Sequence, residues 1–424
     1  MSSPSAHDPY QALRFRDFRL LLTGNLVASV GSQMLALAVG WELYERTGSP
    51  LALGMVGLVQ LLPVLFLAPI TGRLADRHDR KLVVVASQVG LVAASLGLAA
   101  LSLSHGPLAA IYGCLLLRGV AAAFAGPAGS ALPAEVLPEE AFENSASWRT
   151  SAGQAAAIAG PALGGVIIAA THSAAPAYAL SAVGGLLFVG LLLPVRRRYR
   201  ASRPAPGSPD ESNIASLGEG IRFLRERPIL LSALTLDLFA VLLGGAATLL
   251  PVFAKDILHV GPAGLGWLEA APPVGALGVA LFLAHRPPFR RAGSALMLAV
   301  AGFGLATVVF GLSQSFWLSL AMLAALGSLD CISMVIRDTM MLTRVPDDMR
   351  GRVAAIEGVF VGSSNQLGGF ESGVTAQIVG PVASVVGGGI GTVLVVMAVA
   401  LVWPELRMLR TLRREGEAEQ PISA

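Results

Sequence analysis

Long apolar stretches separated by short polar loops run through the whole chain. A bilayer core about 30 Å thick needs roughly 20 apolar residues for each helix that crosses it, so the pattern predicts about 12 transmembrane helices. Their approximate bounds are 18–41, 51–71, 83–104, 108–130, 146–170, 176–194, 229–253, 263–284, 294–313, 316–336, 354–377 and 384–404. The sequence therefore indicates an all-α membrane protein.

The distribution of basic residues predicts the orientation of these helices. Short loops rich in Arg and Lys stay on the cytoplasmic side of a membrane. If the N-terminus is cytoplasmic, only Arg46 and Lys255 would face the outside. We therefore predict a multi-pass protein of the inner, cytoplasmic membrane with both termini in the cytoplasm. The pI near 9.1 then reflects topology, and no nucleic-acid partner is expected.

Composition agrees with a place in the bilayer. Hydrophobic residues make up 54% of the chain and charged residues 13%, which leaves little polar surface for a soluble globule. The charged residues before the first span, without a short apolar core and cleavage site, predict that this helix is retained as an anchor. The only cysteines, Cys114 and Cys331, fall inside predicted spans, so a structural disulfide is not expected.

The chain divides into two related halves. We predict a six-helix bundle at 1–193, a cytoplasmic linker at 194–228, and a second six-helix bundle with a basic tail at 229–424. At an offset of 208 residues, Gly160 matches Gly368 and Gly165 matches Gly373, so the fifth and eleventh spans take equivalent positions. Parallel repeats of this kind are typical of transporters whose substrate site lies between membrane helices.

The linker contains a candidate amphipathic helix. Ile214, Leu217, Ile221 and Leu224 recur at helical spacing after a segment rich in Pro, Gly and Ser. We expect this helix to lie along the membrane surface, with its arginines toward headgroups or water.

The loop after the second span carries a recognisable motif. It reads Gly72-Arg-Leu-Ala-Asp76-Arg77-His-Asp-Arg80-Lys81 and resembles the signature loop of the major facilitator superfamily. The related loop of the second half has His285 where Asp76 would align. The resemblance implies a transporter fold of two pseudo-symmetric bundles that works by alternating access.

A second motif in the fifth span points to the direction of transport. Gly160-Pro161-Ala-Leu-Gly164-Gly165 resembles an element of the exporters and antiporters of this superfamily, although Ala156 replaces an earlier glycine. A plain helix-packing motif is the alternative. Further segments are similar to the branch that contains enterobactin exporters and drug-efflux proteins, and the similarity covers nearly the whole chain.

Polar and ionisable residues within the spans are the candidate site. Such residues are costly in a bilayer and default to functional roles. Arg118 resembles the fourth-helix arginine that antiporters use near a proton site, although a structural partnership with a buried carboxylate is equally possible. For the other polar candidates, a role in coupling or substrate binding and a structural hydrogen bond between helices are the two alternatives. The candidates for coupling or substrate contact are Arg118, Asp237, Glu371, Asn25, Gln33 and Gln366.

Further residues are expected to act in gating or to have simpler roles. The residues expected to act in gating are Gly72, Asp76, Arg77, Arg80, Gly160 and Pro161. Glu269 is interpreted as a vestibule charge, Asp330 as lying nearer the inside, and Glu357 as part of a gate.

Several functional classes receive no support from the sequence. There is no G-x-x-x-x-G-K-[ST] segment, no nucleophile elbow and no metal-ligand spacing of Cys and His. We therefore expect no enzyme and no cofactor, with a proton gradient as the energy source. The predicted function is a monomeric proton-coupled exporter of amphipathic small molecules, of the drug or siderophore class. Alternatives are an importer or lysolipid transporter of the same fold, and a membrane receptor or assembly factor without turnover.

Overall fold

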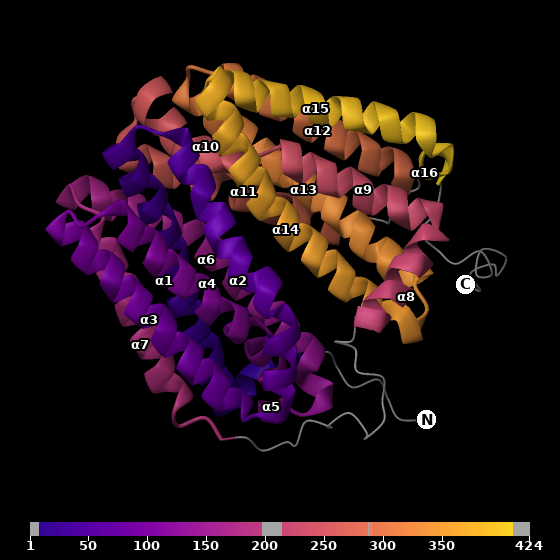
Figure 1. The fold of residues 1–424 in the computed structure, drawn as a ribbon. Coiled ribbons are helices and arrows are strands. Elements are labelled where there is room, and N and C mark those ends of the chain that lie inside the picture. Colours follow the sequence, from indigo (N-terminus) through magenta and orange to yellow (C-terminus); the bar gives the residue numbers. More distant parts are fainter. Residues whose placement is uncertain (1–7, 197–213, 287–288, 290, 410–424) are drawn as a thin grey trace. The chain divides into compact units, whose positions relative to one another are not determined.

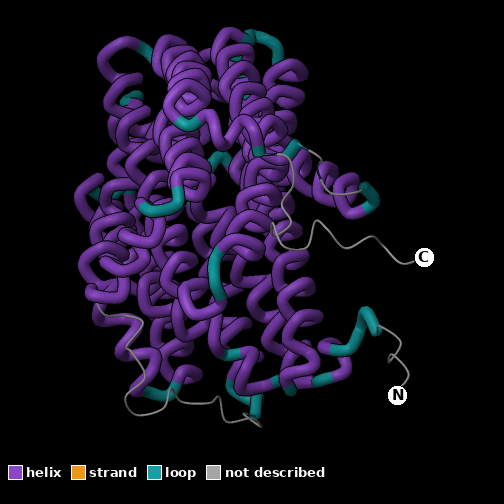
Figure 2. The backbone as a smooth tube through the Cα atoms, turned by 90° about the vertical axis from the view of Figure 1, so that its right-hand side faces the viewer, coloured by secondary structure: helices purple, strands orange, loops and turns teal. Residues whose placement is uncertain are grey.

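The computed structural model describes residues 8–196, 214–286, 289 and 291–409, and every regular element among them is helical (Figures 1 and 2). The chain divides into two compact units. Unit 1 comprises Met1–Glu42 and Leu62–Ser208, and unit 2 comprises Leu43–Leu61 and Pro209–Ala424. The main division falls inside the linker that the sequence predicts at 194–228. The end of the first helix and the start of the second belong to unit 2, which the sequence did not predict.

Unit 1 consists mainly of long helices that match the first six predicted spans. α3 packs against α4 and α7, and these three helices form much of the unit's interior. The helices are α1 (Arg16–Thr47), α2 (Pro50–Arg77), α3 (Arg80–Ser104), α4 (Leu108–Ala131), α5 (Pro133–Val136), α6 (Phe142–Thr171) and α7 (Ala175–Leu192), with short 3₁₀ turns η1 (Ala12–Arg14) and η2 (Glu139–Ala141).

Unit 2 repeats this pattern of packing. α12 lies between α15 and α13, and α11 packs along α13, as Figure 1 shows for the orange and yellow helices. The helices are α8 (Ile214–Arg225), α9 (Pro228–Leu243), α10 (Ala246–Val252), the π-helix η3 (Phe253–Ile257), α11 (Gly261–Ala284), α12 (Ala292–Leu312), α13 (Phe316–Arg344), α14 (Asp347–Val379), α15 (Pro381–Val402) and α16 (Pro404–Met408).

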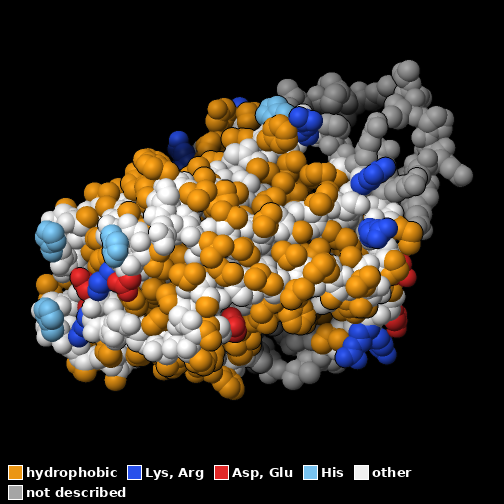
Figure 3. Space-filling view, turned by 90° about the horizontal axis from the view of Figure 1, so that it is seen from above, with side chains coloured by type: hydrophobic (Ala, Val, Ile, Leu, Met, Phe, Trp, Pro, Cys, Tyr) orange, Lys and Arg blue, Asp and Glu red, His pale blue; other side chains and the backbone are white. Residues whose placement is uncertain are grey.

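Eleven helical segments of the described residues are long and apolar enough to cross a membrane. The remaining predicted span, 354–377, lies within α14, a continuous helix of 33 residues and so about 50 Å long at 1.5 Å per residue. This helix carries several polar residues within the predicted span, namely Glu357, Asn365, Gln366 and Glu371. Apolar side chains cover most of the face seen in Figure 3, as a surface in contact with lipid requires.

The seventh span, predicted at 229–253, lies within the apolar segment Pro228–Ile257, but its helix is interrupted, which the sequence did not predict. α9 ends at Leu243, and Gly244 and Gly245 separate it from α10. A Cβ atom on Gly245 would lie 1.9 Å from the Ser372 Oγ of α14, so only glycine permits this approach. Pro251 further weakens the segment because it cannot donate a backbone hydrogen bond. The glycines therefore allow the helix to break and also allow α14 to pack closely at the break.

The same glycine contact occurs in both units. In unit 1, a Cβ on Gly160 of α6 would lie 2.5 Å from the Cβ of Gln33 in α1. In unit 2, a Cβ on Gly368 of α14 would lie 2.9 Å from the carbonyl oxygens of Val241 and Leu242 in α9. Positions 33 and 241 are separated by the same 208 residues as the two glycines. The repeat in sequence is thus a repeat in helix packing.

The helix that ends the linker docks on unit 2. α8 packs against α14 and α9, and Leu224 is buried there whereas Ile221 is exposed. Arg352 of α14 donates to the Glu219 carboxylate across 2.8 Å. Side chains 214–217 lie outside the described residues, so Ile214 and Leu217 are not placed. The amphipathic helix is therefore present, and one part of its apolar face is used for packing within the unit.

Candidate functional site

A cavity of about 410 Å³ lies inside unit 1. Its walls come from α1, α3, α4, α6 and α7, so it is formed by the helices of one bundle. The volume is within the range of roughly 300–1,000 Å³ that is usual for small-molecule sites. Its polar lining residues are Asn25, Ser29, Ser32, Gln88, Ser95, Arg118, Ser130, Arg149 and Ser181, and its larger apolar ones include Phe18, Leu22, Leu91, Val92 and Phe188.

Arg118 is brought to this cavity by α4. One of its terminal nitrogens donates a hydrogen bond to the Ser32 hydroxyl of α1. The sequence left open whether Arg118 pairs with a buried carboxylate. Among the described residues no carboxylate lies within ion-pair distance of it, and the serine takes that position instead. The guanidinium has five N–H donors, so one hydroxyl leaves most of its capacity for whatever fills the cavity.

The two polar candidates of the first span take different positions. Asn25 lines the cavity and is exposed, as a substrate contact requires. Gln33, two turns further on, lies beneath Gly160 at the packing surface between α1 and α6 and is not among the lining residues. The two side chains leave α1 in different directions, because eight residues do not make a whole number of helical turns.

Arg149 is a lining residue that sequence reasoning missed. It lies close to the start of the predicted fifth span, 146–170, and an ionisable residue at that position was itself a signal. The serines of the cavity were also missed, because single serines are common in membrane helices and carry no distinguishing pattern.

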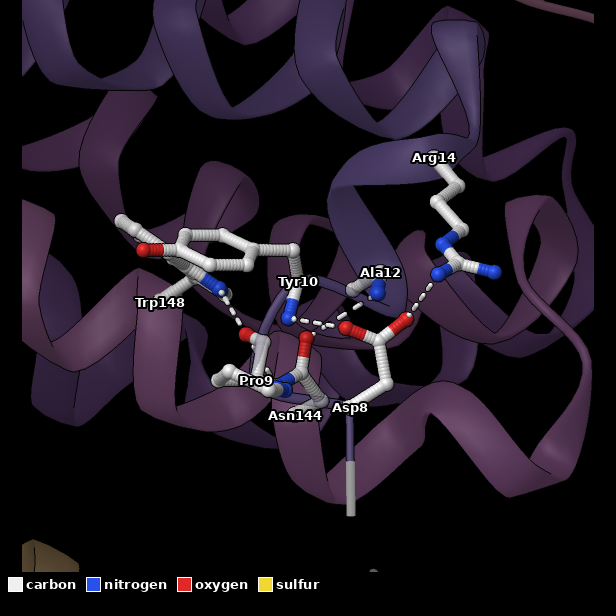
Figure 4. A network of polar contacts seen from close by, with 7 residues as sticks. All are labelled: Asp8, Pro9, Tyr10, Ala12, Arg14, Asn144 and Trp148. Carbon is white, nitrogen blue, oxygen red and sulfur yellow. Dashed lines mark hydrogen bonds and ion pairs between the residues drawn. The ribbon is translucent and has the colours of Figure 1, made fainter. Parts of the chain in front are cut away.

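The start of α6, which carries Arg149, is fastened to the N-terminal segment (Figure 4). The Asn144 amide accepts a hydrogen bond from the backbone N–H of Ala12 across 3.0 Å and donates one to the Pro9 carbonyl across 2.8 Å. The Trp148 indole donates to the same carbonyl, and its ring lies 6.0 Å from that of Tyr10. These contacts hold the start of α6 against the N-terminal segment.

In unit 2, Asp237 of α9 forms a buried ion pair with Arg337 of α13. Arg337 is not among the candidates that the sequence indicated. It was missed because α13 continues to Arg344, beyond the predicted end of the span at 336. Asp330, about two turns before Arg337 on α13, lines a small cavity of about 10 Å³ together with Asp237 and Ser333.

The candidates on α14 have local partners. The Glu371 carboxylate accepts hydrogen bonds from the Thr375 hydroxyl at 2.8 Å and from the Ser372 hydroxyl at 3.3 Å. Gln366 lies beside α2, where a Cβ on Gly57 would be 2.7 Å from its carbonyl oxygen. Glu371 and Gln366 are both partly buried and do not line the cavity of unit 1.

Part of the signature loop is described, and it connects the helix ends of unit 1. The Asp79 carboxylate caps α3 by accepting from the Lys81 backbone N–H at 3.0 Å. The Lys81 ammonium donates to the carbonyls of Leu193 and Val195, at the end of α7. Arg80 lies 3.6 Å from the Glu135 carboxylate of α5. The side chains of Gly72, Asp76 and Arg77 lie outside the described residues.

Residues 7–420 match the family described as transmembrane secretion effectors. The chain belongs to this family. The match covers nearly the whole chain, so both units and the linker are parts of one transporter architecture. The members are transporters and not enzymes, and among the described residues no three His, Cys, Asp or Glu side chains are grouped to hold a metal ion.

Proteins similar in sequence to this chain include exporters. The enterobactin exporter EntS of Citrobacter koseri is 27% identical over 403 residues, and the alignment covers 93% of each protein. EntS of Shigella flexneri is 28% identical over 397 residues with the same coverage.

Solved structures show the fold. The nucleoside transporter NupG superposes with a TM-score of 0.71 at 13% identity, covering 91% of this chain and 100% of that one. The POT family transporter PepTSo gives a TM-score of 0.72 at 13% identity, covering 93% and 98%. The fold of the major facilitator superfamily, which the signature loop indicated, is thereby confirmed.

Proposed function

We propose that this secretion effector is a proton-coupled exporter of amphipathic small molecules, acting as an antiporter by alternating access. The observation that carries the proposal is the cavity of about 410 Å³ in unit 1, which combines apolar walls with Asn25, Gln88 and Arg118. Apolar walls with a few convergent polar groups are the usual form of a site for such a solute. Export is supported by the similarity to EntS over 93% of the chain.

Proton coupling is proposed for the carboxylates of unit 2. Asp237 is the first candidate, because it is buried inside a membrane helix and can exchange its ion pair with Arg337 for a proton. Glu371 is the second, since its hydrogen bonds with Thr375 and Ser372 involve hydroxyls that can also accept from a protonated carboxyl. Gating is proposed for the signature loop and for Gly160 and Pro161.

The test is transport into everted membrane vesicles, in which an exporter accumulates its substrate in the lumen. A panel of dyes, antibiotics and catecholates is offered with and without a proton gradient. We expect accumulation of at least one panel member that a protonophore abolishes. Accumulation only in right-side-out vesicles would favour import, and lysolipids in the panel test that alternative. Transport of nothing in the panel by either orientation, with the protein correctly inserted, would favour a receptor or assembly factor.

Coupling is tested by Asp237→Asn and Glu371→Gln in the same vesicles. We expect at least one variant to lose the dependence of uptake on the proton gradient while downhill exchange of substrate persists. A matched control is Asp338→Asn, which removes an exposed carboxylate from α13 next to Arg337. If both variants keep the wild-type pH dependence, neither carboxylate carries the proton and the coupling assignment is wrong.

A further inference from the structure

The cavity of unit 1 has an unbalanced charge, and its chemistry narrows the substrate class; this inference rests on the proposed function. Its described lining includes two arginines, Arg118 and Arg149, and no Asp, Glu, Lys or His. The carboxylates considered for coupling, Asp237 and Glu371, are both in unit 2. The described lining of the cavity in unit 1 therefore carries positive charge only, and these two carboxylates do not belong to that unit.

Neither arginine of the cavity has an ion-pair partner among the described residues. Arg118 has one described polar partner, the Ser32 hydroxyl, and that group carries no charge. Arg149 is partly buried. An ionised side chain inside a low-dielectric interior is costly unless a counter-charge or several hydrogen bonds offset the loss of hydration. An anion bound in the cavity would supply this counter-charge.

A contrast within the same protein supports this interpretation. Arg337 is also in a membrane helix, but its charge is matched by the Asp237 carboxylate. Arg80, near the start of α3, likewise has Glu135 at 3.6 Å. Both of these arginines thus have an acidic partner close to them. The two that face the cavity differ, and a planar guanidinium is well suited to hold a carboxylate, phenolate, sulfonate or phosphate.

The remainder of the lining fits the rest of such a molecule. Phe18, Leu22 and Phe188 offer apolar and aromatic surface, while Asn25 and Gln88 offer neutral hydrogen-bond donors and acceptors. We propose that this cavity binds the anionic group of an amphipathic solute through Arg118 and Arg149 and discriminates against organic cations. Specificity of this kind arises as much from the repulsion of the wrong charge as from attraction of the right one.

The experiment uses three probes that share one biphenyl scaffold and differ only in charge. They are 4-phenylbenzoate, 4-phenylbenzamide and (4-phenylphenyl)trimethylammonium. Binding to the full-length protein in phosphatidylcholine nanodiscs is measured by isothermal titration calorimetry, with empty nanodiscs subtracted. We expect the carboxylate to bind at least about tenfold more tightly than the amide, equivalent to about 1.4 kcal/mol, and the cation to bind most weakly.

Variants of the two arginines test whether they cause the tighter binding of the carboxylate probe. Arg118→Gln and Arg149→Gln should each reduce the carboxylate preference to less than about half of its wild-type ratio, while the affinity for the amide persists and reports a folded cavity. Arg118→Lys keeps the charge and should retain part of the preference. The matched control is Arg196→Gln, which removes an exposed cation of unit 1 that does not line the cavity. Equal binding of all three probes, or tighter binding of the cation, would overturn the proposal.

Two further arms separate related outcomes. Nanodiscs that contain phosphatidylglycerol test whether a lipid headgroup is the anion, since it would then compete with 4-phenylbenzoate; either source supports an anion site. Vesicle transport separates this inference from the proposed function. Uptake of cationic dyes without any preference for anions would overturn the anion site and leave export standing. Selective anion binding without transport in either vesicle orientation would contradict export alone.

Discussion

Arg337 of α13 is paired with Asp237 of α9, and each of the two side chains is 7% exposed. The residues are 100 positions apart, so the pair joins two helices that the sequence treats as separate spans. A buried ion pair contributes little to stability relative to an apolar pair, but removal of one partner leaves a buried charge without compensation. A comparison of single and double variants can therefore separate a structural role of this pair from a role in proton coupling.

We predict that Asp237→Asn and Arg337→Gln each destabilise the protein, by about 3–5 kcal/mol if the remaining charge stays buried. The double variant should recover much of that loss because no uncompensated charge remains. Thermal unfolding of the purified protein in detergent measures the effect, and Asp338→Asn is the control. If the losses of the single variants simply add in the double variant, the two side chains are not coupled. If the stable double variant still lacks gradient-driven uptake, coupling requires the carboxylate itself.

The packing of α6 on α1 gives a second prediction. A Cβ on Gly160 would lie 2.8 Å from the Val30 carbonyl oxygen as well as 2.5 Å from the Gln33 Cβ, so backbone atoms must move to admit it. Gly160→Ala should therefore lower stability by about 1–3 kcal/mol through overpacking. Gly153 lies on the same helix, and a Cβ added there would meet no atom within 4 Å, so Gly153→Ala is the matched control.

The control should be neutral or stabilising by roughly 0.5–1 kcal/mol, because alanine favours a helix more than glycine does. Both variants are compared by thermal unfolding and by vesicle transport. A Gly160→Ala protein as stable and active as Gly153→Ala would contradict a close packing role for the motif.

The N-terminal contacts of Figure 4 give a third prediction. Asn144→Ala removes both the bond from the Ala12 N–H and the bond to the Pro9 carbonyl, at about 0.5–1.5 kcal/mol each. We expect faster hydrogen exchange at the Ala12 amide and easier proteolysis before α1. Trp148→Phe keeps an aromatic ring near Tyr10 but loses one hydrogen bond, so its effect should be smaller.

Exposed Glu143, next to Asn144, provides the control through Glu143→Gln. Unchanged exchange at Ala12 in the Asn144→Ala protein would mean that other contacts fix the segment.

The fourth prediction concerns topology. Single cysteines at Ser208, in the linker outside the described residues, and at Thr47, at the end of α1, are introduced after replacement of Cys114 and Cys331. An impermeant thiol reagent should label them from opposite sides, Ser208→Cys from the cytoplasm and Thr47→Cys from outside, since basic loops stay inside. Labelling of both from one side would refute the predicted orientation.

Local chemistry made much of the fold predictable. Bilayer thickness sets a fixed length for an apolar helix, so the spans follow from composition along the chain. The amphipathic helix α8 could likewise be predicted from the helical spacing of its apolar residues, and the equivalence of Gly160 with Gly368 from the repeat in sequence. The break within the seventh span was not predicted, because two adjacent glycines can continue a helix or break it according to what packs against them.

The sequence by itself determined that the chain is an all-helical membrane protein and which transporter superfamily its loops resemble. Tertiary structure alone decided which polar side chains meet. It assigned Ser32 to Arg118 and Arg337 to Asp237, brought Arg149 to the cavity with Asn25, and left Gln33 beneath Gly160. The physical reason is that apolar composition fixes the length of a membrane helix but not its rotation about its axis. That rotation is set by packing between helices, and it determines which side chain faces a cavity and which faces a neighbour.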